Sequence, residues 1–278
     1  MGALGPLRLL RLRGVPVLEM LHIEEALYRV KDAGNWMVVN EPPSRRTIVL
    51  GISGKVAELV DAQAALADGA ACVKRFTGGG TVVADGSTVM TSVITGPGGS
   101  PLPGRDAFPG PVMEWSARLF EPVFADSRGP GGASVAFGLT ETDYTVSVGA
   151  GSDQDGGGAR RLKIGGNAQA ISQGRFVHHT SWLWDFDDAS MALLLEPRKR
   201  PNYRGKRTHL DFLTRIRRFM PDRKDFVARL CAAPAAHGWT VTEATESDVA
   251  RILDRPHLRT SREVDLRAAA SPPAPGGR

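Results

Sequence analysis

Short apolar runs rich in β-branched residues recur along the chain, and they restrict the fold more than any other feature of the sequence. Val, Ile and Thr lose side-chain freedom in a helix but pack well on a pleated strand. Where glycine, proline or polar residues bound such a run, we predict a strand. The predicted strands are Leu7–Arg13, Trp36–Val39, Thr47–Leu50, Cys72–Arg75, Thr81–Val83, Val89–Thr95, Ser134–Leu139, Tyr144–Val148, Arg161–Ile164 and Phe176–Trp184.

Amphipathic helical patterns occupy segments between these strands and most of the last third of the sequence. In the first of them, Leu18, Leu21 and Leu27 recur at the spacing of one helix face. The predicted helices are Val17–Asp32, Ala57–Asp68, Val112–Phe124, Ala189–Leu195, Phe212–Phe219, Arg223–Ala236 and Asp248–Leu253. Strands that come in runs, with helices between and after them, predict an α+β fold in which helices pack on a mixed, largely antiparallel sheet.

Two glycine-rich segments interrupt these patterns without marking a domain boundary. Gly96–Gly104 is rich in proline and glycine and is predicted to be a loop. Gly149–Gly158 is polar and lies between two predicted strands, so we interpret it as a long hairpin loop. We therefore expect residues 1–263 to form one domain, and we expect the Ala-, Pro- and Gly-rich residues 264–278 to form a disordered tail.

The composition is that of a soluble globular protein, with 42% apolar and 23% charged residues. Cys72 and Cys231 match no metal-ligand spacing and favour a reducing compartment, so a cytoplasmic location is expected. No apolar stretch reaches the roughly 18 residues that cross a membrane. The arginines before Glu19 resemble a targeting segment, but apolar and basic residues alternate over Leu7–Arg13, which favours a first strand over a transit peptide.

A net charge of +5 and a pI near 9.5 suit a nucleotide, a nucleic acid or an acidic protein as partner. Basic residues concentrate between Glu196 and Arg218. They are Arg198, Lys199, Arg200, Arg204, Lys206, Arg207, Arg215, Arg217 and Arg218. No zinc finger or aromatic RNA-binding motif accompanies them, so a nucleic-acid partner is not expected. The segment is either a solvated surface or a docking face.

Three consecutive glycines, Gly78–Gly80, follow Lys74 and Arg75 directly after a predicted strand. Glycines expose backbone N–H groups and permit positive φ, so an anionic ligand can approach the main chain closely. Arg can hold a phosphate through paired donors. The alternative is a plain hairpin turn, which needs only two residues. Neither a Walker loop nor a dinucleotide-binding fingerprint is present, because no Gly-Lys-Ser/Thr and no G-x-G-x-x-G occurs.

Lys163 lies at the end of a predicted strand and is followed by Gly165 and Gly166, where the chain itself can lie against a ligand. A cation at this place would stabilise a phosphate or a developing oxyanion, although a lone strand lysine is more often only exposed. Asp143 at the start of a strand could equally be a turn cap. His178 and His179 should point to opposite faces of a strand, which disfavours a shared metal.

Together these segments resemble the lipoate–protein ligase A family of the biotin and lipoate ligase superfamily. Arg75–Val82 is similar to its R-x-[ST]-G-G-G-[AT]-V loop, and Thr142-Asp143 falls at its Asn-Asp pair. Lys163–Ala168 resembles its K-[IV]-[SG]-G-[SN]-A strand, and Phe176–Ser181 resembles its H-H-[GT]-[ST] strand. The four motifs occur in the family's order.

The resemblance implies a class II synthetase-like catalytic domain with Lys163 as the catalytic residue and no metal ligand among the side chains. It implies ATP and Mg²⁺ as cofactors and lipoate as substrate, with a lysine of a lipoyl acceptor domain as the group acylated through an adenylate. The implied acyl-adenylate-binding residues are Arg75, Thr77, Gly78, Gly79, Gly80, Thr81, Thr142, Asp143, Gly165, Gly166 and Ala168. Acidic acceptor domains would make Arg198–Arg218 a docking face, where charge reversal at Arg204 and Arg207 should raise the KM for the acceptor.

The sequence departs from the family in two places. Val83-Ala84-Asp85 stands where the family has an aromatic residue, a histidine and an aspartate. Fewer than fifty residues follow Gly238, too few for the family's C-terminal accessory domain, so a separate accessory protein is a further expected partner. The alternatives are a ligase-like protein that binds a lipoyl compound or nucleotide without turnover, or a relative of the octanoyl or biotinyl transferases. The last is disfavoured because Cys231 lies in a late helix and the biotin ligase motifs do not occur.

Overall fold

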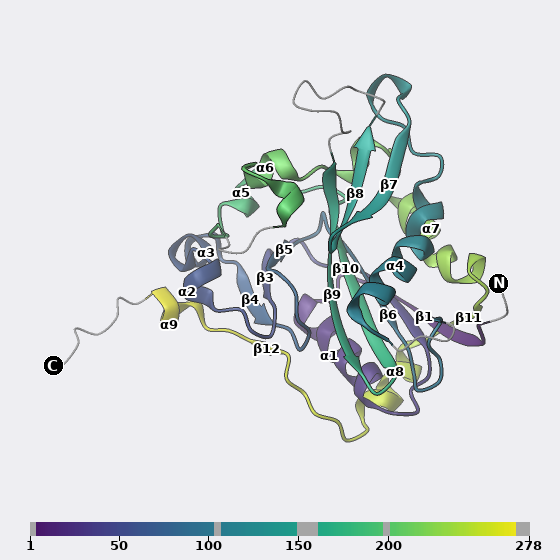
Figure 1. The fold of residues 1–278 in the computed structure, drawn as a ribbon. Helices are drawn as coiled ribbons and strands as arrows, with labels where there is room; N and C mark the ends of the chain where they lie inside the picture. Colours follow the sequence, from purple (N-terminus) through teal and green to yellow (C-terminus); the bar gives the residue numbers. More distant parts are fainter. Residues whose placement is uncertain (1–3, 103–106, 149–160, 197–200, 271–278) are drawn as a thin grey trace.

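The computed structural model describes residues 4–102, 107–148, 161–196 and 201–270, and its strands form two sheets (Figure 1). The expected hairpin loop at Gly149–Gly158 and the basic residues 198–200 lie outside these ranges. The strands are β1 (Pro6–Arg13), β2 (Trp36–Glu41), β3 (Thr47–Leu50), β4 (Ala71–Lys74), β5 (Val82–Ala84), β6 (Val89–Ile94), β7 (Val135–Thr140), β8 (Asp143–Val148), β9 (Leu162–Ser172), β10 (Arg175–Trp182), β11 (Thr240–Glu243) and β12 (Arg262–Glu263). The α-helices are α1 (Val17–Arg29), α2 (Val56–Leu59), α3 (Ala62–Asp68), α4 (Pro109–Phe120), α5 (Asp188–Met191), α6 (His209–Phe212), α7 (Arg223–Ala236), α8 (Glu246–Leu253) and α9 (Leu266–Ala270).

The larger sheet has eight strands in the order β11-β1-β2-β6-β10-β9-β8-β7. Only β1 pairs in parallel, with β11 and with β2, and the other neighbours are antiparallel. The smaller sheet has the order β12-β4-β3-β5, with one parallel pair, β3 and β4. The predicted α+β fold with a mixed, largely antiparallel sheet is therefore confirmed.

Helices cover both faces of the larger sheet (Figure 1). On one face, α4 and α7 contribute Trp115 and Phe226 to an aromatic core around Trp182, whose ring packs edge-on against Phe120 at a centroid distance of 5.1 Å. On the other face, α1 and the smaller sheet share a second core that includes Met20 and Val49. The smaller sheet thus lies over the larger one, and the loop between β4 and β5 faces β9.

The first strand and the cysteines fit the expectations from composition. Leu7–Arg13 forms most of β1, with Leu7 and Leu9 buried, as predicted for a strand. Cys72 and Cys231 are free and buried, and burial raises the pKa of the Cys72 thiol to about 11, which suits a packed rather than a reactive group. Among the described residues, no helix is both long and apolar enough to cross a membrane.

Two predicted helices are shorter than expected because tertiary contacts interrupt them. The segment Ala57–Asp68 is divided at Val60, which takes an extended conformation and pairs with Leu194. Asp61 then caps α3 by accepting a hydrogen bond from the Ala64 N–H at 2.9 Å. The same pairing ends the predicted helix Ala189–Leu195, since only Asp188–Met191 is α-helical.

The predicted helix Phe212–Phe219 is wrong, because the chain is extended where it meets β9. Helix α6 ends at Phe212, and Leu213 pairs in parallel with Lys163. The Thr214 N–H donates to the Lys163 carbonyl at 2.9 Å. Strand β9 itself runs to Ser172, well past the predicted end at Ile164. A glycine pair therefore lies inside a strand and not at its end.

The expected disordered tail contains ordered structure at its start. Val264 donates its N–H to the Cys72 carbonyl at 2.8 Å, and Leu266–Ala270 forms α9 against α3. Leu266 is buried with Ile48 and Ala65 in the core on the outer side of the smaller sheet. The prediction from Ala, Pro and Gly content is thus wrong for residues 264–270, and residues 271–278 lie outside the described ranges.

We expect Leu266→Ala to lower the free energy of unfolding by about 2 kcal/mol, because it leaves a cavity in this core. Leu258→Ala is the matched control, since Leu258 is 61% exposed and its loss should change stability by less than about 0.5 kcal/mol. Urea denaturation of both variants measures the difference. Equal stabilities would contradict the packing of α9.

Candidate functional site

The glycine loop, residues Thr77–Gly80, connects β4 to β5 and lies against the backbone of β9. The Gly78 N–H donates to the Gln169 carbonyl at 3.3 Å. Gly79 has φ +99°, and a Cβ there would lie 3.0 Å from the Ala168 Cβ and 3.2 Å from the Asn167 carbonyl oxygen. Only glycine meets both the conformation and the close approach, so the glycine run is more than a hairpin turn.

The other side of the glycine loop rests on the turn after β3. A Cβ on Gly51 would lie 2.4 Å from the Gly79 carbonyl oxygen, so glycine is required at this contact as well. The Ile52 N–H donates to the Thr77 carbonyl at 2.9 Å. The loop is therefore held between two backbones, whereas a Cβ built on Gly80 would meet no atom of the described residues within 4 Å, apart from Gly80 itself and its chain neighbours. Gly80 leaves its part of the loop accessible to a ligand.

Arg75 points into the protein and not outward as the sequence suggested. Its guanidinium donates to the carbonyls of Gly78 at 2.9 Å and Gly80 at 2.7 Å. The residue is 3% exposed, and this burial lowers the pKa of Arg75 to about 10, although a charge on Glu24 opposes the shift. Arg75 remains protonated at neutral pH. Its place in this structure is that of a loop support, which corrects the expectation of direct phosphate binding.

A buried hydrogen-bonded chain holds the first residue of the glycine loop from α1. Thr77 Oγ1 lies 3.1 Å from His179 Nε2, and His179 Nδ1 lies 2.9 Å from Glu24 Oε2. Glu24 also accepts a hydrogen bond from Ser92 and is fully buried. Sequence reasoning missed Glu24, although it lies between Leu21 and Leu27 on the apolar face of α1. A carboxylate at such a position indicates a specific polar partner inside the protein.

Lys163 and Asp143 form an ion pair across β9 and β8, with Nζ and Oδ1 2.8 Å apart. Asp143 pairs with Gly166 in the sheet, and a β-bulge shifts the register so that Lys163 lies on the same face. A Cβ on Gly166 would lie 3.3 Å from Lys163 Nζ, so the bare glycine gives the ammonium room to reach Asp143. The Lys163 side chain is 20% exposed, which leaves its charge accessible to an anion.

Tyr203 completes the surroundings of this ion pair, although no sequence pattern pointed to it. The Tyr203 hydroxyl donates to Asp143 Oδ2 at 2.9 Å, and its backbone N–H donates to Glu141 Oε1 at 2.9 Å. Burial and the charge of Asp143 raise the pKa of Tyr203, so the hydroxyl stays protonated and continues to donate. Both oxygens of Asp143 are therefore engaged, and the carboxylate orients Lys163.

The remaining predicted residues lie along the same part of β9. The Thr142 carbonyl accepts from Asn167 at 3.1 Å. Gly165 packs under Trp182, where a Cβ would come within 3.3 Å of the ring. Thr81 Oγ1 is buried without a hydrogen-bond partner among the described residues. The structure thus brings the glycine loop and the Lys163–Asp143 pair to one stretch of backbone, Gly165–Gln169.

The two adjacent histidines point to opposite faces of β10, as predicted. His178 Nε2 lies 3.0 Å from the Tyr144 hydroxyl, and His178 Nδ1 lies 3.0 Å from Gln169 Nε2. Tyr144 donates onward to Ser116 on α4 at 2.6 Å. His178 is a satisfied core residue and His179 a loop support. Among the described residues, no group of three His, Cys, Asp or Glu side chains is placed to hold a metal ion.

Among the described residues of the basic segment, Arg204, Arg207 and Arg215 are engaged with the rest of the domain. Arg204 is 3% exposed, binds Glu196 at 2.9 and 3.0 Å, and lies over the Phe212 ring. Arg207 donates to the Arg161 carbonyl at 2.9 Å and also lies over Phe212. Arg215 pairs with Asp185 and Asp188. The choice of Arg204 and Arg207 as docking residues is therefore wrong, since both hold the segment against the domain.

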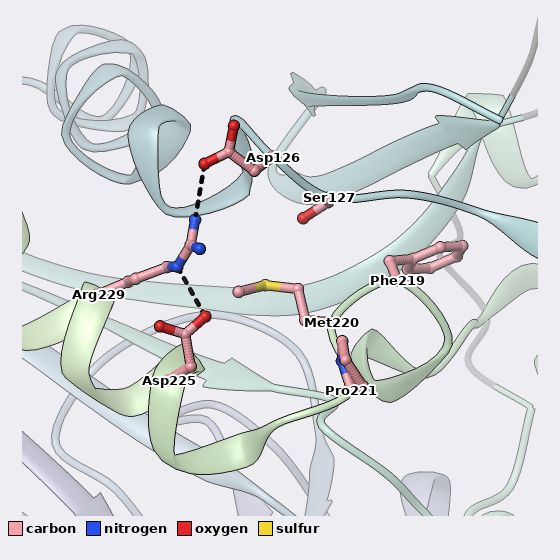
Figure 2. A pocket seen from close by; sticks show the side chains of 7 residues that line it. All are labelled: Asp126, Ser127, Phe219, Met220, Pro221, Asp225 and Arg229. Atoms are coloured by element: carbon pink, nitrogen blue, oxygen red, sulfur yellow. Dashed lines mark hydrogen bonds and ion pairs between the residues drawn. The ribbon is translucent and has the colours of Figure 1, made fainter. Parts of the chain in front are cut away.

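Two hollows in the described part of the protein differ in their relation to the site. One of about 70 Å³ lies between α7 and the turn after α4, where Arg229 bridges Asp126 and Asp225, and it contains no predicted site residue (Figure 2). A larger one of about 530 Å³ is open and is lined by residues of β9, the β9–β10 turn and the start of α4, including Gln169 and Ile171. Gln169, which lines this hollow, also accepts a hydrogen bond from the Gly78 N–H through its backbone carbonyl.

The donor set suits an anionic group. Lys163 presents a partly exposed cation, and the main chain at Gly80 is open, as the binding of a phosphate or an acyl-phosphate mixed anhydride requires. Both oxygens of Asp143 already have a partner, Lys163 at Oδ1 and Tyr203 at Oδ2, so a divalent cation would have to compete with the Lys163 ammonium for this carboxylate. A Mg²⁺ ion would accordingly be held mainly by the phosphates of a nucleotide.

Comparison with known proteins shows which family this chain is similar to. The family model for the lipoyl protein ligase A/B catalytic domain matches residues 16–234. The chain is 27% identical over 251 residues to a protein named inactive lipoate–protein ligase 2 of Plasmodium falciparum (isolate 3D7). That match covers 74% of this chain and 62% of the relative, so the chain spans less than two thirds of the relative's length.

Two solved structures have the same fold. One is a bipartite lipoate protein ligase of Thermoplasma acidophilum, studied with its E2 lipoyl domain, with a TM-score of 0.63 and 20% identity over 90% of this chain and 92% of that chain. The other is a lipoate–protein ligase A bound with ATP, with a TM-score of 0.61 and 20% identity over 92% of this chain and 95% of that chain. The similarity confirms the predicted ligase-like architecture.

We expect Arg204→Glu to reduce the free energy of unfolding by about 2 kcal/mol. The substitution places a second carboxylate next to Glu196, at a position that is buried in the folded protein. Lys206→Glu, at an exposed position nearby, should change it by less than about 0.5 kcal/mol. Chemical denaturation compares the two. An Arg204→Glu variant of unchanged stability would contradict the structural role and reopen the docking interpretation.

His178 should make stability depend on pH. Burial, aided by the neighbouring His179, lowers the pKa of His178 to about 3 from an ordinary value of 6.5. Below pH 6.5 the unfolded chain binds a proton that the folded protein does not, so stability falls as the pH falls, by up to about 1.4 kcal/mol per unit. Urea denaturation of His178→Gln should show a shallower slope between pH 6.5 and 5 than the unsubstituted protein. Equal slopes would contradict this.

Proposed function

Because the chain belongs to the lipoyl protein ligase A/B catalytic domain family, we propose that it uses a lipoyl-type acyl adenylate to acylate a lysine of an acceptor domain. The adenylate is formed from lipoate and ATP on this chain, or it is supplied preformed. The proposed acyl-adenylate-binding residues lie along the glycine loop and β9. Arg75 acts in this proposal through the carbonyls of the glycine loop and not on the ligand itself.

The observation that carries the proposal is the position of Lys163. Its ammonium lies over the bare backbone of Gly166, is fixed by Asp143, and remains 20% exposed next to the glycine loop. A Cγ1 methyl of Val82, just after this loop, lies 3.6 Å from where a Gly166 Cβ would be. A phosphate between the loop and β9 would therefore meet one cation and the open main chain at Gly80. This fits the α-phosphate and acyl oxygen of an acyl adenylate.

The proposed reaction has two steps, and negative charge develops near Lys163 in both. In the first, a lipoate carboxylate oxygen attacks the α-phosphorus of ATP, the bond to the β-phosphate breaks, and pyrophosphate leaves. Mg²⁺ carried by the nucleotide would neutralise phosphate charge in this step. In the second, a neutral lysine amine of the acceptor attacks the acyl carbon, an amide bond forms, and AMP and a proton leave. Lys163 stabilises negative charge on the phosphate and on the acyl oxygen.

The proposed partner is a lipoyl acceptor domain, as in the Thermoplasma ligase that was studied with its E2 lipoyl domain. That ligase is bipartite, which supports a separate accessory protein as a second proposed partner for this chain. The acceptor must reach the adenylate from the open side of Lys163. The cytoplasm remains the expected location, and no nucleic acid or membrane partner is proposed.

A ligase-like protein that binds without turnover is the second candidate. Two observations favour it: the relative from Plasmodium falciparum is named inactive, and Ala84 occupies the position of the family's histidine. Ala84 is fully buried on β5 in the core shared with α1, so no polar side chain replaces that histidine. ATP–pyrophosphate exchange in the presence of lipoate separates the candidates, since a protein that only binds cannot support exchange.

We expect the purified protein to acylate a lipoyl acceptor domain from synthetic lipoyl adenylate, and Lys163→Ala to slow this transfer by on the order of 100-fold. Lys224→Ala, an exposed substitution on α7, is the control and should transfer at the normal rate. Mass spectrometry of the acceptor measures the product. A parallel reaction with lipoate, ATP and Mg²⁺ tests the adenylation step.

Each outcome decides between the candidates. Product in both reactions identifies a complete ligase, and product from the adenylate alone identifies a transferase or a ligase that needs a partner. Product that is undiminished in Lys163→Ala would refute the role of Lys163. No product from either reaction would refute the enzyme proposal and favour the binding protein.

A further inference from the structure

The segment that follows α8 runs across α1 and contacts Phe76, the residue directly before the glycine loop. It passes from Arg255, which pairs with Asp32, to β12 on the edge of the smaller sheet (Figure 1). In β12, Arg262 lies beside Lys74 and Glu263 beside Val73, immediately before the loop. This segment lies outside residues 16–234, the part that matches the family model. Its contacts with the loop therefore involve residues beyond the part that the family model matches.

Glu25 fixes this segment to α1. Its carboxylate accepts hydrogen bonds from the Thr260 N–H at 2.9 Å, from the Thr260 hydroxyl at 2.6 Å and from the Ser261 N–H at 2.9 Å. Arg29 pairs with the same carboxylate at 2.9 Å. Burial raises the pKa of the Glu25 carboxyl, but the hydrogen bonds from Thr260, Ser261 and Arg29 outweigh it and hold that pKa below its usual value. A fully buried carboxylate is thus committed to residues 260 and 261.

Ser261 connects Glu25 to Phe76, the residue directly before the glycine loop. Its Oγ accepts a hydrogen bond from the Phe76 N–H at 3.2 Å, and its carbonyl lies 3.0 Å from His22 Nε2. Ser261 is 4% exposed and Phe76 is 5% exposed, so water does not replace the bond. The Phe76 ring stacks on Tyr28 at a centroid distance of 6.0 Å. Phe76 is the residue directly before Thr77, and its backbone sets where the loop begins.

Two hydrogen-bonded chains therefore hold the start of the glycine loop, and they begin at neighbouring residues of α1. Glu24 reaches Thr77 through His179, and Glu25 reaches Phe76 through Ser261. Consecutive residues of a helix point in directions about 100° apart, so the two carboxylates hold the loop from two sides. The Glu24 chain uses residues inside the part that the family model matches, whereas the Glu25 chain needs residues 260 and 261, which lie beyond it.

We propose that Ser261, held by Glu25, is a positioning residue for the glycine loop and raises its affinity for the acyl adenylate. This inference rests on the proposed function in naming that ligand. The loop binds through its main chain, so the position of Phe76 decides whether the following N–H groups face a phosphate. Fixing the loop before the ligand arrives removes part of the ordering cost of binding.

Calorimetric titration with a non-hydrolysable sulfamoyl analogue of lipoyl adenylate tests the proposal on the full chain. We expect Ser261→Ala to weaken binding about tenfold, the loss of one buried hydrogen bond. Ser261→Thr retains the hydroxyl and should restore most of the affinity. Leu266→Ala is the matched control, because it destabilises the same segment without contacting the loop, and it should bind the analogue as the unsubstituted protein does.

Hydrogen exchange of residues 75–81 provides a second measurement that needs no ligand. Ser261→Ala should speed exchange of the Phe76 amide, and Leu266→Ala should not. If the unsubstituted protein fails to bind the analogue, the proposed function is refuted, and the exchange result still tests the loop support. If it binds and Ser261→Ala binds equally with unchanged exchange, the positioning role is refuted. An equal loss of affinity in Leu266→Ala would also refute it, since general destabilisation would then be the cause.

Discussion

The close packing of the glycine loop on the backbone of β9 is the contact on which the site depends. Gly79 approaches Ala168 and Asn167 so closely that no side chain fits between them, and Gly51 meets the loop from the other side in the same way. The contact joins the smaller sheet to the larger one. It places the open main chain at Gly80 and the ammonium of Lys163 on the same stretch of β9, Gly165–Gln169. Gly79 and Gly51 lie in a loop and a turn, and the absence of a Cβ at each permits this approach.

Buried polar groups hold the glycine loop in one conformation, which its glycines alone would not do. Three side chains hold the loop from different directions: Arg75 binds its carbonyls, Thr77 is held through His179 and Glu24, and Phe76 is held by Ser261. A buried polar or charged group is costly unless it is hydrogen-bonded, and the Arg75, His179 and Glu24 side chains all have hydrogen-bond partners. A loop that is ordered without its ligand can bind a phosphate through backbone N–H groups with less loss of entropy on binding.

The site combines residues that match the family's motifs with residues that differ from them. Lys163, Asp143 and the glycines form the arrangement that we propose to hold an acyl adenylate, while Ala84 is part of the core. The Arg204 and Arg207 side chains are used to hold the segment that carries Tyr203, and Tyr203 in turn holds Asp143. Basic residues that a sequence suggests for a partner are thus engaged in building the site.

The glycine and lysine residues proposed for the site followed from the resemblance to the ligase family. The sequence by itself determined the α+β class and most of the strands, because periodicity and glycine spacing are local properties of the chain. It did not determine the direction of Arg75, the buried place of Arg204 or the order of residues 264–270. These depend on which carbonyl, carboxylate or core residue a distant segment brings near. The roles of Glu24, Glu25 and Ser261 were decided only by tertiary structure, since the partners that connect them to the loop, His179, Ser261 and Phe76, lie more than a hundred residues away in the chain. A hydrogen bond needs its two atoms within about 3 Å, and only the folded chain sets that distance.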